Sequence, residues 1–227
     1  CEPYLRLNEL EVRAEGLNRY LNARLQENKS FTDEANPDSS NDFGKNIIPA
    51  MLGAGEKLMA YRFHGYWKDV GTINSLWDAN MDMLSPDSGL DLSDESWPIY
   101  ARSVDAPPIY MGGDSHVSHS AINRGCDIEG TVENSVLSPR VTIEKGARVS
   151  YSVILPGVTV EAGSVIEYAI IGEGCHIGRE CRVGGTPDST PGGKWNLTVL
   201  APDCALEDGR EIAPGVMLDR YGKEVLK

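Results

Sequence analysis

The stretch ILPGVTVEAGSVIEYAI, residues 154–170, places Ile154, Val160 and Ile166 six residues apart, and the next apolar position, Ile171, follows five residues later. An α-helix repeats an apolar face about every 3.6 residues and a two-sided strand every second residue, so neither produces this spacing. A three-sided coil does, because each side contributes a short strand whose inward side chains stack over those of the next turn. The stretch therefore predicts one turn of a parallel β-helix.

The same pattern recurs in four rows that begin at Ile122, the first of 15 residues and the others of 17. The aligned apolar columns are Ile122, Leu137, Ile154 and Ile171; Ile128, Ile143, Val160 and Ile177; and Val149, Ile166 and Val183. Glycines stand between the columns, where tight corners favour positive φ: Gly125, Gly146, Gly157, Gly163 and Gly174. A further column is small, as expected where backbones crowd: Ser135, Ser152 and Ala169. We expect each strand to pair in parallel with its equivalent in the next row.

Two cysteines take apolar places in this alignment. Cys126 and Cys175 share a column with Val141 and Val158. We therefore expect each thiol to be a small buried hydrophobe and not a ligand or a nucleophile. The five cysteines of the chain contain no CxxC pair, so neither a disulfide framework nor a zinc ribbon is indicated.

Composition limits the classes of partner. The formal net charge of −13 opposes binding to nucleic acid or to an anionic membrane. No apolar run approaches the roughly 20 residues of a membrane span, and the first residues show no signal-peptide pattern. His116, His119 and His176 are scattered, and we predict no metal at them because histidine is equally at home on a solvated strand face. We expect a soluble, cytoplasmic protein.

The first 84 residues lack this six-residue repeat and show patterns typical of helices and loops. Helical spacing connects Ala14 with Leu25, a short helix is expected near residues 47–52 and a strand over residues 57–63. Thr72 is a plausible N-cap for a following helix. The loop GYWKDVGT, residues 65–72, thus lies at a helix N-terminus, where unpaired N–H groups favour a phosphate or a carboxylate.

Several stretches together resemble bacterial glucose-1-phosphate adenylyltransferases, also called ADP-glucose pyrophosphorylases: SSNDFGKNIIPAML, GYWKDVGTINSLWDANMDML, WPIYAR and the repeats from Gly130 to Gly178. The resemblance implies a mixed fold, with the remnant of an α/β, Rossmann-like nucleotidyltransferase domain in residues 1–84. A linker over residues 85–108 and a left-handed parallel β-helix of hexapeptide-repeat type over residues 109–227 follow. It also implies that ATP and glucose 1-phosphate form ADP-glucose and pyrophosphate for glycogen synthesis. An allosteric metabolite and an oligomer, usually a tetramer, are further implications.

The resemblance also implies roles for four residues. Asp42 and Phe43 match residues that line the sugar pocket, Trp67 matches another, and Asp69 matches the carboxylate that helps hold Mg²⁺. Carboxylate oxygen is a ligand that Mg²⁺ prefers. The alternatives are structural, since Asp42 also fits a capped helix start and Asp69 a capped turn. No residue is assigned as a catalytic acid, base or nucleophile.

One departure from the family is large. Its nucleotide-binding signature, a Gly-rich loop ending in Thr-Arg-Leu, does not occur in this chain, and residues 1–32 fit the family poorly. Matches for the second metal carboxylate and for the sugar-phosphate-binding lysine are also absent. We therefore expect the chain alone to be inactive and to serve as the C-terminal part of the enzyme. The alternatives are a non-catalytic regulatory or assembly subunit and a β-helix acyltransferase using His176.

Overall fold

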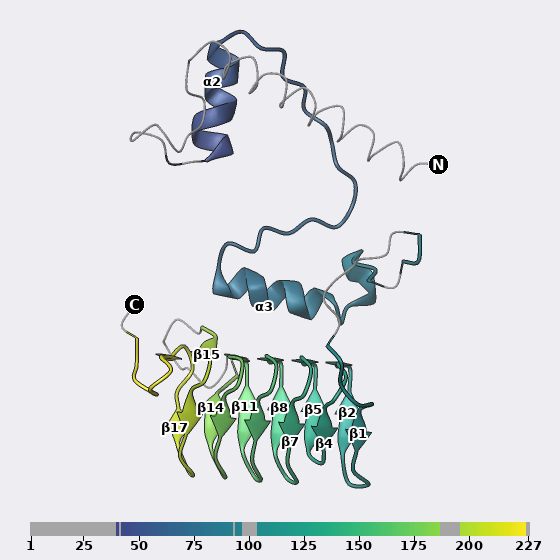
Figure 1. Cartoon of the computed structure of the whole chain (residues 1–227), viewed down its shortest axis with the longest axis vertical. Helices are drawn as coiled ribbons and strands as arrows, with labels where there is room; N and C mark the ends of the chain where they lie inside the picture. Colours follow the sequence, from purple (N-terminus) through teal and green to yellow (C-terminus); the bar gives the residue numbers. More distant parts are fainter. Residues whose placement is uncertain (1–39, 41, 93, 97–103, 187–195, 226–227) are drawn as a thin grey trace. The chain divides into compact units, whose positions relative to one another are not determined.

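The structure is a computed structural model that describes residues 40, 42–92, 94–96, 104–186 and 196–225 (Figure 1). The chain divides into two compact units, of which the first ends at His64 and the second begins at Gly65. The helix predicted between Ala14 and Leu25 and the WPIYAR motif lie outside the described residues. None of the helices in the described parts has the length and apolar content needed to cross a bilayer.

Most of the second unit is a three-sided parallel β-helix, seen in Figure 1 as a row of stacked coils. One sheet contains, in order, β1 (Tyr110–Met111), β4 (Asp127–Ile128), β7 (Thr142–Ile143), β10 (Thr159–Val160), β13 (His176–Ile177) and β16 (Ala205–Leu206). A second contains β2 (His116–Ser118), β5 (Thr131–Glu133), β8 (Arg148–Ser150), β11 (Val165–Glu167), β14 (Arg182–Gly184) and β17 (Glu211–Ile212). The third, here called sheet 3, contains β3 (Ala121–Ile122), β6 (Val136–Leu137), β9 (Val153–Ile154), β12 (Ala169–Ile171), β15 (Thr198–Leu200) and β18 (Met217–Leu218).

The predicted row alignment is confirmed to the residue. Val160 pairs in parallel with Ile143 on one side and with Ile177 on the other. All three side chains are fully buried, because stacking equivalent positions builds a continuous apolar interior. The columns continue beyond the predicted rows, where Leu200 pairs with Ile171 after a longer row.

The corners also follow the prediction, since the five predicted glycines all have positive φ, between 68° and 78°. Four residues with side chains take positive φ as well, in one column that precedes the strands of sheet 3: His119, Asn134, Tyr151 and Tyr168, with φ from 44° to 48°. Left-handed backbone costs a residue with a Cβ about 1–2 kcal/mol. The two tyrosines are therefore held in place by their surroundings.

The residues of the small column, Ser135, Ser152 and Ala169, are buried, and both seryl hydroxyls form hydrogen bonds. The Ser152 N–H donates to Ser135 Oγ at 3.1 Å, and the Ala169 N–H donates to Ser152 Oγ at 3.1 Å. Each seryl hydroxyl in turn donates to a backbone carbonyl two residues earlier. The hydroxyls thus link successive coils without leaving a buried polar atom unpaired.

Gly130 shows how closely the coils approach. A Cβ at this position would stand against the carbonyl oxygen of Ala147 and 2.8 Å from that of Glu144, whereas a Cβ on Gly113 would meet nothing within 4 Å. We expect Gly130→Ala to lower the free energy of unfolding by about 1–3 kcal/mol, the usual cost of overpacking, and Gly113→Ala to change it little. Urea denaturation followed by circular dichroism measures the stability of both variants. Equal midpoints would contradict the close approach of the neighbouring coil to Gly130.

The cysteine prediction is confirmed. Cys126 and Cys175 are each only 1% exposed and lie in the same core as Val141 and Val158. Burial raises the pKa of the Cys175 thiol to about 11. A thiol that stays protonated at neutral pH is a poor nucleophile and a poor ligand, so these side chains serve as packing.

Outside the coils the described elements are helical. They are the π-helix η2 (Phe43–Ile47), α2 (Ile48–Gly53), α3 (Ile73–Asp82) and the 3₁₀ helix η3 (Pro86–Ser88). The predicted helix at residues 47–52 is confirmed. The strand predicted over residues 57–63 is wrong, because these residues are irregular and exposed and no strand among the described residues before β1 is there to pair with them. Apolar content alone does not make a strand without a hydrogen-bonding neighbour.

Candidate functional site

The loop GYWKDVGT is fixed at its downstream end by the start of α3. Thr72 is the N-cap, as predicted: the Ser75 N–H donates to Thr72 Oγ1 at 3.1 Å, and the Thr72 N–H donates to Ser75 Oγ at 3.0 Å. This reciprocal capping box satisfies two backbone donors that a helix start otherwise leaves free. The chain direction just after Asp69 is therefore defined by α3.

The middle of the loop is fixed by the other end of the same helix. Lys68 Nζ donates to Asp82 Oδ2 at 2.6 Å, and the Tyr66 hydroxyl donates to the same oxygen at 2.9 Å. Asp82 is the last residue of α3, so the loop folds back along the helix. The sequence analysis did not assign Lys68, and no periodic pattern reveals a contact made over 14 residues.

The three groups change one another's acidity. The hydrogen bond from Lys68 lowers the pKa of Asp82, and the same bond raises the pKa of Lys68. Burial first, and then the Asp82 carboxylate, raise the pKa of Tyr66. The ion pair is thus charged throughout the neutral range, and its side chains are about 30% exposed or less.

The lowered pKa of Asp82 has a defined effect on stability. Because the folded form binds its proton less readily, the carboxylate stabilises the fold fully above the ordinary value of 3.8, and this contribution is lost as pH falls through the folded pKa. We expect the Asp82 carboxyl resonance to titrate below 3.8 in an NMR titration. Lys68→Met should raise that pKa and Lys45→Met should not, and an unchanged titration in Lys68→Met would contradict the contact.

Trp67 and Asp69 extend from this fixed loop into solvent. Trp67 is 75% exposed, and the Asp69 side chain is also exposed. Within the described part of the chain, the Asp69 carboxylate has no hydrogen bond or ion pair, unlike that of Asp82. The capped start of α3 follows three residues later, so the alternative in which Asp69 only favours the helix N-terminus stays open. The two side chains are available to a ligand.

Asp42 and Phe43 belong to the first unit. The Lys45 N–H donates to Asp42 Oδ1 at 2.9 Å, and the Asn46 N–H donates to the Asp42 carbonyl oxygen at 2.8 Å. One oxygen of Asp42 thus caps the start of η2, as the structural alternative predicted, while Oδ2 has only a distant Lys45 ammonium at 3.9 Å. Phe43 begins η2, and its side chain is outside the described atoms.

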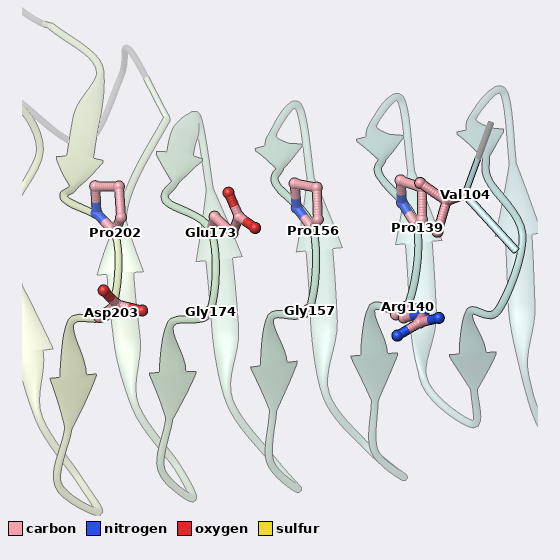
Figure 2. A pocket seen from close by; sticks show the side chains of 9 residues that line it. All are labelled: Val104, Pro139, Arg140, Pro156, Gly157, Glu173, Gly174, Pro202 and Asp203. Carbon is pink, nitrogen blue, oxygen red and sulfur yellow. The ribbon is translucent and has the colours of Figure 1, made fainter. Parts of the chain in front are cut away.

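A hollow on the coils contains none of these residues. It has a volume of about 690 Å³ and follows one corner of the β-helix, where Pro139, Pro156, Glu173 and Pro202 occupy equivalent positions of successive coils (Figure 2). Arg140, near one end, donates to the carbonyl oxygen of Asp105, so the chain that enters the β-helix is fastened there at 2.7 Å. Prolines and glycines make up most of its lining, and Arg140, Glu173 and Asp203 add charged groups.

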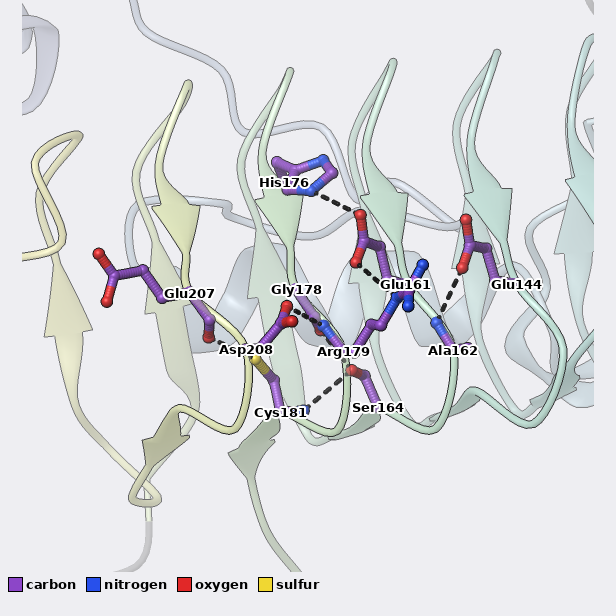
Figure 3. A network of polar contacts seen from close by, with 10 residues as sticks. All are labelled: Glu144, Glu161, Ala162, Ser164, His176, Gly178, Arg179, Cys181, Glu207 and Asp208. Atoms are coloured by element: carbon purple, nitrogen blue, oxygen red, sulfur yellow. Dashed lines mark hydrogen bonds and ion pairs between the residues drawn. The ribbon is translucent and has the colours of Figure 1, made fainter.

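A polar network covers another part of the coils (Figure 3). Glu161 lies 3.0 Å from His176 Nε2 and 3.5 Å from Arg179 Nε. The Arg179 N–H also donates to Asp208 Oδ1 of the next coil at 2.8 Å. His176 is therefore one member of a surface ladder of charges that connects successive coils.

The carboxylate of Asp69 is compatible with Mg²⁺, as carboxylate oxygen is in general. Its two carboxylate oxygens are hard donors, exposed and without a competing partner among the described residues. No group of three or more His, Cys, Asp or Glu residues in the described part of the chain is placed to hold a metal ion. The donor set thus fits a single carboxylate ligand, which is compatible with Mg²⁺ because this ion usually keeps several waters.

Comparisons with known proteins match the two parts separately. The nucleotidyl transferase family model matches residues 20–86, and the model for GlmU-like C-terminal hexapeptides matches residues 110–198. The glucose-1-phosphate adenylyltransferases of Bacillus mycoides (strain KBAB4) and Bacillus anthracis are each 53% identical over 117 residues, 52% of this chain and 31% of the relative. The chain thus spans about a third of the length of these curated relatives.

A solved structure resembles the coils only loosely. The acetyltransferase domain of PglB from Neisseria gonorrhoeae FA1090, in complex with acetyl coenzyme A, has a TM-score of 0.40 and 19% sequence identity, over 53% of this chain and 58% of that chain. We draw nothing about function from that likeness. The chain is similar to glucose-1-phosphate adenylyltransferases over its C-terminal half, and it joins a segment similar to nucleotidyl transferases to a β-helix similar to GlmU-like hexapeptides.

Proposed function

We propose that this chain acts in a glucose-1-phosphate adenylyltransferase, which joins ATP and glucose 1-phosphate into ADP-glucose and pyrophosphate for glycogen synthesis. One observation carries the proposal: Asp42, Phe43, Trp67 and Asp69 all lie within the segment that matches nucleotidyl transferases, and the C-terminal half is 53% identical to enzymes of that name. The β-helix supplies the scaffold on which oligomerisation and control by a metabolite are built.

The residues have distinct tasks in this reaction. A phosphate oxygen of glucose 1-phosphate bonds to the α-phosphorus of ATP, and the bond from that phosphorus to the bridging oxygen of pyrophosphate breaks. The rings of Phe43 and Trp67 cover faces of the sugar, and the free oxygen of Asp42 accepts a sugar hydroxyl. Asp69 would hold Mg²⁺, which would supply positive charge to the phosphates when bound.

The exposed state of Trp67 and Asp69 supports these tasks. A ring that is 75% exposed gains apolar contact when a sugar covers it, and an unpaired carboxylate gains a cation without breaking an existing ion pair. Lys68 and Tyr66 hold the loop from the opposite side through Asp82, so the binding groups need not order the loop themselves.

The test is pyrophosphate release with ATP, glucose 1-phosphate and Mg²⁺. The chain is assayed alone and as a chimera, in which it replaces the corresponding part of the Bacillus mycoides relative, including the positions equivalent to Asp42, Phe43, Trp67 and Asp69. We expect the chimera to release pyrophosphate and form ADP-glucose, and the chain alone to release none. A chimera that folds and binds ATP but forms no ADP-glucose would overturn the proposal in favour of a regulatory or assembly subunit.

A further inference from the structure

Sheet 3 differs from the other two sheets on its outer side. Leu137, Ile154 and Ile171 point inward and belong to the core, so Val136, Val153 and Ile170 beside them point outward. These three outward side chains are nevertheless only 8%, 2% and 5% exposed. On the sheet that contains β10 the outward positions are mainly polar: Asp127, Thr142, Thr159 and His176. Sheet 3 therefore carries an apolar outer face that another part of the molecule covers.

Helix α3 contacts the coils beside this face through an aromatic stack. The rings of Tyr151 and Tyr168 lie 4.7 Å apart and nearly parallel at 8°, and each residue stands at the corner just before a strand of sheet 3. Trp77 of α3 stacks on Tyr168 at 5.9 Å, and its Nε1–H donates to the carbonyl oxygen of Tyr151 at 2.8 Å. The helix thus reaches the coils through one ring and one hydrogen bond.

The same helix holds the candidate site at both its ends. Thr72 at the start of α3 and Asp82 at its end fix the backbone on either side of Asp69. A helix is a rigid connection, so a displacement of α3 moves the loop with it. Anchoring Trp77 to the coils therefore anchors Asp69 as well.

We propose that Trp77, with Tyr168 and Tyr151, is a positioning residue that locks α3 onto the β-helix and so sets the place of the Trp67 and Asp69 loop. Tyr168 carries the ring that Trp77 meets, and the ring of Tyr151 supports Tyr168 from the neighbouring coil. The link to turnover rests on the proposed function, whereas the link to loop geometry does not.

Hydrogen exchange in the chain itself tests the geometry. We expect Trp77→Leu and Tyr168→Leu each to speed exchange of the Thr72 amide, which donates to Ser75 Oγ at the end of the loop, and of the α3 amides of residues 76–82. The expected factor is roughly tenfold, as loss of a hydrogen bond or an aromatic pair produces. The double variant should be no faster than either single one, because both break the same contact. Trp77→Phe, which keeps a ring, should fall between wild type and Trp77→Leu.

Two controls make the result specific. Leu76→Ala alters the adjacent, 40% exposed residue of α3 and should leave exchange of the loop unchanged. The amides of β9 and β10 should stay protected in every variant, so that loosening of the loop is distinguished from unfolding of the coils. Unchanged exchange at Thr72 and at residues 76–82 in Tyr168→Leu would overturn the inference.

The chimera described above tests the consequence for catalysis. There Trp77→Leu should lower kcat and raise the Mg²⁺ concentration for half-maximal rate, each roughly tenfold, with the KM for ATP unchanged. A chimera that is inactive without any substitution, combined with faster loop exchange in the variants, would contradict the proposed function and still support the positioning contact. An active chimera that Trp77→Leu leaves unaffected would overturn the inference.

Discussion

Replacing Val160 by Asp is expected to lower the free energy of unfolding by about 3–5 kcal/mol, the cost of a buried charge that has no partner. Val160 is fully buried in β10, between Ile143 and Ile177 of the neighbouring coils. No basic side chain lies within that apolar column, so the new carboxylate either stays charged without compensation or takes up a proton at neutral pH. Both outcomes destabilise the stack.

The matched control lies one residue earlier. Thr159 occupies the same strand but faces outward, and Thr159→Asp places the same charge in solvent. We expect that variant to change the free energy of unfolding by less than about 1 kcal/mol. Urea denaturation followed by circular dichroism measures both variants, and similar losses in the two would contradict the inward and outward assignment of the strand.

Asp69→Asn in the active chimera is expected to reduce kcat by roughly 10²–10³-fold, as found when a group that offsets transition-state charge is removed. The amide has almost the same volume as the carboxylate, and Asp69 has no partner among the described residues whose loss would unfold the loop. Thermal stability should therefore stay as in the parent. Raising the Mg²⁺ concentration should restore part of the rate if the loss is one of metal affinity.

Asp87→Asn is the control for charge alone. Asp87 is an exposed carboxylate of η3, so its replacement removes one negative charge from the second unit without touching the loop. Its rate should equal that of the parent. Full turnover in Asp69→Asn would remove the metal role from Asp69, and an equal loss in both variants would point to net charge as the cause.

The β-helix was predictable because its information is local and repeated. Six-residue spacing placed Val160, Ile166 and their equivalents in columns, and the pairing of Val160 with Ile143 and Ile177 confirms the register. The outer face of sheet 3 was missed, although a signal was present in adjacent apolar pairs such as Val153 with Ile154 and Ile170 with Ile171. Such pairs indicate a strand covered on both sides.

The candidate site was predictable only in part. Thr72 was found because an N-cap depends on residues a few positions away. The contacts of Lys68 with Asp82 and of Trp77 with Tyr151 connect positions 14 and 74 residues apart, and no spacing rule reports them. The strand predicted at residues 57–63 was wrong for a related reason. A strand needs a hydrogen-bonding neighbour, and the local sequence does not show whether one is present. The ligand roles of Asp42, Phe43, Trp67 and Asp69 stay predictions.

The row-by-row pairing makes the coil a linear polymer of nearly interchangeable units. Among the described coils, each strand pairs with its equivalents in the neighbouring rows, and the hydroxyls of Ser135 and Ser152 likewise accept from the backbone of the next row. Removing one whole row of 17 residues leaves every downstream column in register, whereas removing a single residue rotates all later side chains out of place. Length can thus change in steps of one turn, and the interior tolerates whole turns far better than fractions of one.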